Sequence, residues 1–368
     1  MSAPVGVRSR LVPVRAGTAP VVLLLGILLI ALAGCGGKPA AGAGSDSSPA
    51  TITVTDEQKR ELTLPADVKR VVSINSYNTE LLIALGVRDK IVGIDDRSVF
   101  RAPFGHFSKD DVVGVDFGAF NYEKIVAAKP DLVVVPRNGG WEEAATKLES
   151  FHIPVLVLTV WDPTIWNDNV RLVSKIFNKQ EQADKIINFS DKVHALVKDR
   201  VKGLDRVPVY YEDSKDFASA GSKSGKTAAI TEGGGRNIFE DVDTNDGLVI
   251  TVDPADVLVA DPDVILRENI SQFPPVEQST LTSTLSAMLQ RKGWSSLKAV
   301  KSGRVTVYNA GPLDAAGRTF SSLYFGKWLH PDAFADVDPD SYVDQWAKEF
   351  LGSSFDGSTG YFAGAGDK

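Results

Sequence analysis

Short apolar runs rich in β-branched residues alternate with helical segments along most of the chain, and this alternation most constrains its fold. Helical segments lie between the runs, and one of them, Thr79–Leu85, ends at Gly86, a residue that commonly stops a helix. Alternating strands and helices predict an α/β fold with parallel sheets. Four of the runs are typical of strands covered on both faces: Val71–Ile74, Ile91–Ile94, Leu132–Val135 and Val155–Leu158.

A long segment from Glu181 to Val201 interrupts this alternation. Its apolar residues recur at spacings of three and four, polar residues fill the gaps, and Gly203 ends the run. This pattern predicts one long amphipathic helix. Strands then resume at Val207–Tyr211, Val264–Leu266 and Val305–Tyr308.

The parts of the chain on either side of this helix repeat each other. The segment Pro130–Val135 recurs as Pro262–Leu266, and Arg70–Ile74 recurs as Arg206–Tyr210 in the same order. We therefore predict an α/β fold of two similar lobes with mostly parallel sheets, joined by one long α-helix. The expected boundaries are 51–178 for the N-terminal lobe, 179–203 for the linker helix, 204–351 for the C-terminal lobe and 352–368 for a flexible tail rich in Gly, Ser and Asp.

The N-terminus has the features of an export signal. Three arginines precede the apolar run Val21–Leu32, which is too short to span a membrane. The run ends in Leu32-Ala33-Gly34-Cys35, which resembles the lipobox of bacterial lipoproteins, where the cysteine is lipidated after cleavage. We expect a signal peptide over 1–34, lipidation of Cys35 and a flexible tether over 35–50. The alternative is an ordinary signal peptide with an incidental cysteine.

Composition excludes several kinds of site and partner. Cys35 is the only cysteine, so the folded part contains no disulfide and no thiolate metal site. The formal net charge of −7 argues against nucleic acid as a partner and against attraction to anionic lipid. Membrane contact is therefore expected through the lipid anchor only.

The candidate ligand site follows from the predicted sheets. Ligands of open parallel sheets bind beyond the carboxyl ends of the strands, and two lobes can turn both sets of ends toward one cleft. Arginine, aromatic and amide side chains follow these strands, and they suit an anionic ligand with apolar or π surface. The candidate ligand-binding residues are Ser76, Tyr77, Asn78, Arg97, Arg137, Trp141, Trp161, Tyr211, Arg267 and Arg318.

Other motifs do not indicate chemistry. Gly221–Thr227 looks like a phosphate loop but has three residues between its glycines where the motif needs four, so we interpret it as a surface loop. The four histidines do not pair at metal-ligand spacing. Since the chain offers no catalytic constellation, we predict a protein that is not an enzyme and has no cofactor and no metal ligands of its own.

Ordered motifs from about Ile52 to Phe350 resemble the solute-binding proteins of bacterial ABC importers for iron–siderophore complexes, haem or cobalamin. They include Asn78-Thr79-Glu80-Leu81-Leu82, Ala128-Lys129-Pro130-Asp131-Leu132-Val133, Gly234-Gly235-Arg236-Asn237-Ile238 and Lys327-Trp328-Leu329-His330-Pro331-Asp332. The resemblance implies two α/β lobes bridged by one helix. It also implies a docking glutamate on each lobe for the permease. Glu123 fits the first position, whereas the second falls on Ala255, where Asp253 or Asp256 would have to substitute.

We therefore expect a lipid-anchored, extracytoplasmic and monomeric substrate-binding lipoprotein of an ABC importer. Its partners would be an ABC permease with its ATPase and a small-molecule metal chelate, most simply an iron(III) siderophore. A molybdate or other oxyanion, haem or cobalamin receptor of the same family is the nearest alternative. Alternatives of other classes are a lipid-anchored surface hydrolase and a structural or adhesive surface protein.

Overall fold

The computed structural model describes residues 50–99, 107–115, 118–243, 249–269, 277–357 and 361–365. The predicted signal peptide, Cys35 and all of the tether except Ala50 lie outside the described residues. In the described part, no helix is long and apolar enough to cross a membrane.

The first sheet has five parallel strands in the order β5-β4-β3-β6-β7. Most of their side chains are buried, as the short β-branched runs predict for a sheet that is covered on both faces. The strands are β3 (Val71–Ser73), β4 (Ile91–Asp95), β5 (Val112–Gly114), β6 (Leu132–Val135) and β7 (Val155–Val157).

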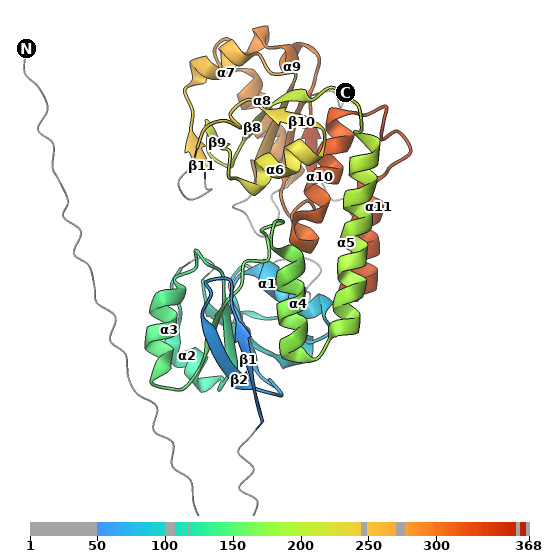
Figure 1. The fold of residues 1–368 in the computed structure, drawn as a ribbon. Coiled ribbons are helices and arrows are strands. Elements are labelled where there is room, and N and C mark those ends of the chain that lie inside the picture. The colour runs from blue at the N-terminus through green and yellow to red at the C-terminus, as the bar shows by residue number, and fades with distance from the viewer. Residues whose placement is uncertain are drawn as a thin grey trace, which may run out of the picture. The chain divides into compact units, whose positions relative to one another are not determined.

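Helices cover both faces of this sheet (Figure 1). Apolar side chains of α1 and α4 pack in one core cluster, and those of α2 and α3 pack in another. These helices are α1 (Ser76–Ala84), α2 (Tyr122–Ala127), α3 (Trp141–Glu149) and α4 (Trp166–Phe177), with short 3-10 turns η1 (Arg88–Lys90) and η2 (Lys109–Asp111). We call this part of the protein the first lobe.

A hairpin of β1 (Thr51–Thr55) and β2 (Glu61–Pro65) was not expected from the sequence. The buried carboxylate of Asp56, in its turn, accepts hydrogen bonds from the Arg60 guanidinium at 2.6 Å and from the Val157 N–H at 3.3 Å. These bonds fix the turn of the hairpin against the end of β7.

The long helix α5 spans Gln180–Arg200, within one residue of the predicted segment at each end. Its buried residues Ala183, Ile186, Ile187, Val193 and Val197 recur at helical spacing. In Figure 1 this helix runs beside α10 (Ala315–Leu329) and α11 (Pro339–Trp346).

The second sheet has the order β10-β8-β12-β13-β14. The first four strands are parallel, whereas β14 pairs with β13 in the antiparallel direction. The predicted flexible tail is therefore wrong for Phe362–Gly364, which form β14 because the exposed edge of β13 offers backbone partners. The strands are β8 (Val207–Glu212), β10 (Gly235–Asn237), β12 (Val264–Asn269), β13 (Val305–Asn309) and β14, and β9 (Ala218–Ala220) pairs separately with β11 (Val249–Thr251).

We call the part built on this sheet the second lobe. The interpretation of Gly221–Thr227 as a surface loop is wrong at its C-terminal end, because α6 begins at Gly225 and buries Lys226 and Thr227. The helical elements after β8 are α6 (Gly225–Glu232), α7 (Pro254–Ala260), α8 (Gln278–Leu289), η3 (Trp294–Ser296), α9 (Lys298–Lys301), α10, α11 and the π-helix η4 (Ala347–Leu351).

The repeat detected in the sequence corresponds to equivalent structure. Lys129 and Asp261 both adopt positive φ at the end of a short helix, at 45° and 44°. The next strand then begins alike, since the Asp131 N–H donates to the Arg70 carbonyl at 2.8 Å and the Asp263 N–H to the Pro208 carbonyl at 3.0 Å. The predicted fold class, two similar lobes with mostly parallel sheets and one long helix, is confirmed.

A second connection reinforces the linker helix. The buried carboxylate of Glu80, in α1, accepts hydrogen bonds from the Ala316 N–H and from the Trp346 indole, both at 2.8 Å. These donors belong to α10 and α11, whereas α1 belongs to the first lobe. The two lobes therefore share buried polar contacts as well as α5.

Candidate functional site

The carboxyl end of β3 leads directly to a contact between the lobes. Asn75 adopts a φ of +83°, and its side chain caps α1 by accepting a hydrogen bond from the Tyr77 N–H at 3.1 Å. The Tyr77 hydroxyl donates to Oδ2 of Asp314, in the second lobe, at 2.9 Å. The half-buried ring of Trp161 lies 5.9 Å from the Tyr77 ring. An aromatic pair therefore meets a carboxylate at the boundary between the lobes.

Behind Asp314 lies a buried charged cluster at the ends of β8, β12 and β13. The Lys226 ammonium contacts Oδ1 of Asp314 at 2.6 Å and Oε2 of Glu268 at 2.8 Å. The same Glu268 oxygen accepts hydrogen bonds from the hydroxyls of Tyr211 at 2.7 Å and Tyr308 at 2.8 Å. We call Tyr77, Tyr211, Lys226, Glu268, Tyr308, Asp314 and Arg318 the inter-lobe cluster.

The protonation of this cluster follows from burial and charge. Burial alone raises the pKa of Asp314, but Lys226 and Arg318 lower it to about 2. Burial raises the pKa of Glu268 above its ordinary value, although Lys226 opposes the rise. Burial and Glu268 together raise the pKa of Tyr211 well above its ordinary value, so its hydroxyl keeps its proton.

Arg318 reaches this cluster from a strained turn at the start of α10. Ala316, Gly317 and Arg318 have φ values of 49°, 65° and 71°, and the left-handed region costs about 1–2 kcal/mol for each non-glycine residue. The Arg318 side chain is 13% exposed, and its Nε lies 3.5 Å from Oδ1 of Asp314. A Cβ placed on Gly225 would lie 3.2 Å from its Nη1 and 3.5 Å from Pro163, so the guanidinium lies close to both lobes.

The guanidinium of Arg318 has few partners for its five N–H groups. Among the described residues, Asp314 is its ion-pair partner, and its buried Nε has no hydrogen-bond partner. Burial alone lowers the pKa of Arg318, but Asp314 and Glu268 raise it above its ordinary value, so the group stays charged. A guanidinium can bind an oxyanion through paired N–H groups, and strained backbone often occurs at ligand sites.

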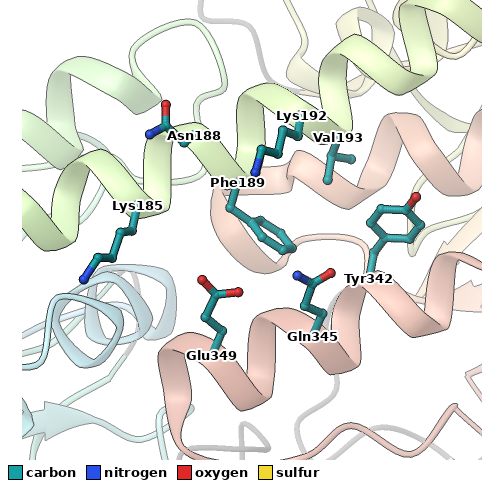
Figure 2. Close-up of a pocket in the computed structure, with 8 residues that line it drawn as sticks. All are labelled: Lys185, Asn188, Phe189, Lys192, Val193, Tyr342, Gln345 and Glu349. Atoms are coloured by element: carbon teal, nitrogen blue, oxygen red, sulfur yellow. The ribbon is translucent and has the colours of Figure 1, made fainter.

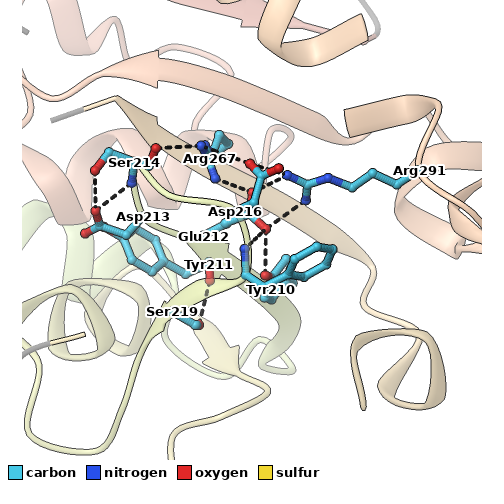
Figure 3. A network of polar contacts seen from close by, with 10 residues as sticks. Tyr210, Tyr211, Glu212, Asp213, Ser214, Asp216, Ser219, Arg267 and Arg291 are labelled. Atoms are coloured by element: carbon cyan, nitrogen blue, oxygen red, sulfur yellow. Dashed lines mark hydrogen bonds and ion pairs between the residues drawn. The ribbon is translucent and has the colours of Figure 1, made fainter. Parts of the chain in front are cut away.

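Arg267, in contrast, is engaged within the second lobe. Figure 3 shows Arg267 and Arg291 both bonded to the buried carboxylate of Glu212. Arg267 also donates to the Ser214 carbonyl at 2.7 Å, and Arg291 contacts Asp216 at 2.7 Å. Arg267 is only 6% exposed, and the ion pairs of this network already neutralise its charge.

The other candidate residues lie in four different surroundings. Arg137 forms an ion pair with Asp162 at 2.8 Å, and the ring of Trp141 lies 4.3 Å from the Arg60 guanidinium. Ser76 and Asn78 are buried in the first turn of α1, and Asn78 donates to the Ile74 carbonyl at 3.1 Å. The partly buried Arg97 follows β4, where its N–H donates to Asp95 at 2.9 Å. The structure thus brings together Tyr77, Trp161, Tyr211 and Arg318.

Four members of the cluster, Lys226, Glu268, Tyr308 and Asp314, were not predicted as site residues. Glu268 follows Arg267 on the same strand end, so the strand-end rule pointed to it without distinguishing the two. Lys226 lies in the rejected phosphate-loop segment, and nothing in the sequence around Asp314 distinguished it. The described residues contain no group of three or more His, Cys, Asp or Glu side chains placed to hold a metal ion.

Two hollows lie away from the cluster. One is a groove with a volume of about 250 Å³. Figure 2 shows how side chains of α5 face those of α11 and η4 across it, including Phe189, Tyr342 and Glu349. The second hollow, of about 310 Å³, lies between the β1–β2 turn and α4, and Arg137 is part of its wall. Neither is lined by a residue of the inter-lobe cluster.

The candidate docking residues occupy comparable helix starts. Asn121 caps α2 by accepting a hydrogen bond from the Lys124 N–H at 3.0 Å, and the exposed Glu123 follows in the first turn. Asp253 caps α7 by accepting from the Ala255 N–H at 2.8 Å. Ala255 thus stands two residues after its cap, as Glu123 does, and Asp256 is the exposed carboxylate next to it.

Comparison with known proteins extends this picture. A family model described as periplasmic binding protein matches residues 71–311. An uncharacterised ABC transporter substrate-binding lipoprotein, YvrC of Bacillus subtilis, is 25% identical over 88% of this chain and 99% of its own. The probable siderophore-binding lipoprotein YfiY of the same organism is 28% identical over 46% of this chain and 51% of its own. Vitamin B12-binding proteins are among the other relatives.

Solved structures agree on the fold. The molybdate-binding protein MolA of Haemophilus influenzae, in its molybdate-bound form, has a TM-score of 0.67 and 21% identity, covering 83% of this chain and 99% of its own. These family members are solute-binding proteins rather than enzymes, and the family match covers more than half of the sequence. The chain therefore belongs to the periplasmic binding protein family and is a substrate-binding protein of an ABC transporter.

Proposed function

We propose that this protein captures an anionic, oxygen-rich metal chelate, an iron(III) siderophore in the first place, and delivers it to an ABC permease. The observation that carries this proposal is the charged guanidinium of Arg318 at the lobe boundary, with only Asp314 as an ion-pair partner among the described residues. Guanidinium forks bind carboxylate and other anionic oxygens through paired N–H groups. Oxygens of this kind surround the metal in siderophores.

The aromatic pair beside Arg318 suits the organic part of such a ligand. Trp161 is half-buried and its ring lies 5.9 Å from that of Tyr77. Aromatic faces cover apolar and π surface, which a siderophore offers and a bare inorganic anion does not. A relative named for siderophore binding supports this choice, although it matches about half of the chain.

A molybdate-type oxyanion is the second candidate. It is favoured by the enclosed position of Arg318 next to the hydroxyl of Tyr77, and by a molybdate-binding relative that matches over nearly its whole length. The hydroxyls of Tyr77, Tyr211 and Tyr308, however, already donate to carboxylates. Carboxylates beside the site would also repel a dianion. Haem and cobalamin remain alternatives that the same titration tests.

Titration of the purified protein decides between these ligands. Ferrichrome, ferric enterobactin, haemin, cyanocobalamin and molybdate would each be added while intrinsic tryptophan fluorescence is followed. We expect tight binding of a ferric siderophore, and Arg318→Asn should weaken it about a hundredfold, because two charge-assisted hydrogen bonds are lost. Asparagine tolerates the left-handed backbone at this position. Arg200→Gln, which removes a distant surface ion pair with Asp336, is the matched control and should leave affinity unchanged.

If the protein binds molybdate and none of the siderophores, molybdate becomes the proposed ligand instead. An unchanged siderophore affinity in Arg318→Asn would refute the site itself. The fluorescence of the unliganded variant shows whether its fold is retained.

Delivery to the permease would use the two helix starts. Glu123 in α2 and Asp256 in α7 are exposed, whereas the carboxylate of Asp253 is engaged in capping. We therefore favour Asp256 as the partner of Glu123 in docking. A first-turn acid also stabilises its own helix by about 0.3–1 kcal/mol, which is the alternative role of both residues.

We further propose that Cys35 carries a lipid that holds the protein at the extracytoplasmic face of the membrane, as a monomer. The names of two relatives, which are called lipoproteins, support this assignment. We expect little closure of the lobes on ligand binding, because α5 and the Glu80 contacts both resist hinge bending.

A further inference from the structure

The two carboxylate oxygens of Glu268 have unequal surroundings. Oε2 is within hydrogen-bond distance of three donors, the hydroxyls of Tyr211 and Tyr308 and the ammonium of Lys226, at 2.7, 2.8 and 2.8 Å. Oε1 is fully buried and has no hydrogen-bond partner among the described residues. A buried acceptor without a donor is strongly unfavourable, so such an atom at the strand ends of a candidate site points to a donor that a ligand would supply.

This acceptor belongs to the same cluster as the under-partnered guanidinium. Glu268 contacts Lys226 at 2.8 Å, Lys226 contacts Asp314 at 2.6 Å, and Asp314 lies 3.5 Å from Arg318. Glu268 stands at the carboxyl end of β12, where ligands of parallel sheets bind. One continuous chain of contacts therefore carries an unsatisfied donor group at one end and an unsatisfied acceptor at the other.

These two groups make opposite demands on a ligand. Arg318 requires acceptor oxygens, whereas Oε1 of an ionised Glu268 requires an N–H or O–H donor. The three donors on Oε2 hold the carboxylate plane and so fix the direction in which Oε1 can accept. A tetrahedral oxyanion such as molybdate carries no proton at neutral pH, and it would meet Oε1 with like charge.

We propose that Glu268 selects the ligand by accepting a hydrogen bond at Oε1, so that the protein takes chelates with an N–H or hydroxyl donor beside their anionic oxygens. This inference rests on the proposed function, because it assumes that the ligand binds in the inter-lobe cluster. It assigns amide-bearing siderophores to the protein and excludes bare oxyanions. Glu268 is thereby a specificity-determining residue, and Lys226, Tyr211 and Tyr308 position it.

The test is Glu268→Gln, which changes no volume. The glutamine carbonyl oxygen can replace Oε2 and keep its three donors, which places an NH₂ group at the position of Oε1. An acceptor thus becomes a donor. We expect ferrichrome or ferric enterobactin, whichever the wild type binds, to bind the variant about 10- to 100-fold more weakly. Molybdate affinity should stay the same or increase.

Glu181→Gln is the matched control, because it makes the same change of a carboxylate to an amide in an exposed pair with Lys185 on α5. It should bind the siderophore within a few-fold of the wild type. Should Glu268→Gln fail to fold, the wild type can be titrated with a derivative of the same siderophore in which the amide nitrogens are methylated. Weaker binding of the methylated derivative supports the inference.

Equal or tighter siderophore binding by Glu268→Gln would overturn the inference, because it would show that Glu268 is protonated or faces no ligand donor. Equal binding of the methylated derivative would overturn it as well. If the wild type binds no siderophore at all, the proposed function fails, and that result is obtained without any variant.

Discussion

Replacement of Asp314 by asparagine tests the energetics of the inter-lobe cluster directly. Asparagine keeps the shape of the side chain and an oxygen for Lys226, but it removes the charge that Lys226 and Arg318 face at 2.6 and 3.5 Å. The pKa of Asp314 falls from 3.8 to about 2, which corresponds to about 2 kcal/mol of stability at neutral pH. Asp314→Asn should therefore lower the free energy of unfolding by about 2 kcal/mol.

The sign of the pH dependence follows from the direction of this shift. A carboxyl group with a depressed pKa in the folded state stabilises the protein above its unfolded pKa, and this stabilisation is lost as the pH falls toward the folded value. The difference between wild type and Asp314→Asn should therefore be constant near neutrality, decrease between pH 4 and pH 2 and vanish below about pH 2.

Urea unfolding of both proteins, followed by fluorescence at several pH values, measures this difference. The slope of the transition should be unchanged and its midpoint lowered. Asp336→Asn is the control, since the Asp336 carboxylate is exposed in its pair with Arg200, and its stability should stay close to the wild type. Equal stability of Asp314→Asn and wild type at pH 7 would refute the argument, as would a difference that keeps its full size at pH 2.

Three further predictions concern the anchor, the docking surface and the strained turn. Cys35→Ala should release the protein from the membrane without unfolding it, as fractionation after a high-salt wash would show; continued membrane binding contradicts the lipid anchor. Glu123→Ala combined with Asp256→Ala should leave ligand affinity unchanged and reduce uptake in cells, and normal uptake rules the docking scheme out. Gly317→Ala should destabilise the protein by about 1–3 kcal/mol in urea unfolding, because the added Cβ would overlap the Trp166 ring and the φ of +65° disfavours alanine. A variant as stable as wild type would show that this turn can relax.

Local sequence patterns were sufficient for much of the fold. Strands such as Leu132–Val135 and the helix α5 follow from periodicity, because burial on one or both faces decides which neighbouring positions are apolar. The repeated Pro-Asp motif predicted two lobes because the same local bonds begin the strand in each. The hairpin of β1 and β2 was missed because its turn is held by Asp56, whose partner Val157 lies 101 residues away.

Local sequence patterns predicted the candidate site less completely than the fold. The strand-end rule found Tyr77, Tyr211 and Arg318, since a parallel sheet directs its loops to one edge whatever their composition. It ranked Arg267 equally with Arg318, because sequence does not show which arginine is already neutralised. Glu212, which neutralises Arg267, lies 55 residues from it, on a different strand.

The sequence by itself determined the two-lobed α/β architecture, the linker helix and the carboxyl ends of the strands, where we propose that the ligand binds, because these depend on periodicity and on motifs of a few residues. Only the tertiary structure decided which charges meet there. Tyr77 and Asp314 are 237 residues apart, and Lys226 reaches Asp314 across 88 residues. Electrostatic pairing depends on distance in space, so the Glu268 Oε1 and the Arg318 Nε, which have no hydrogen-bond partner among the described residues, are recognised only when the chain is folded.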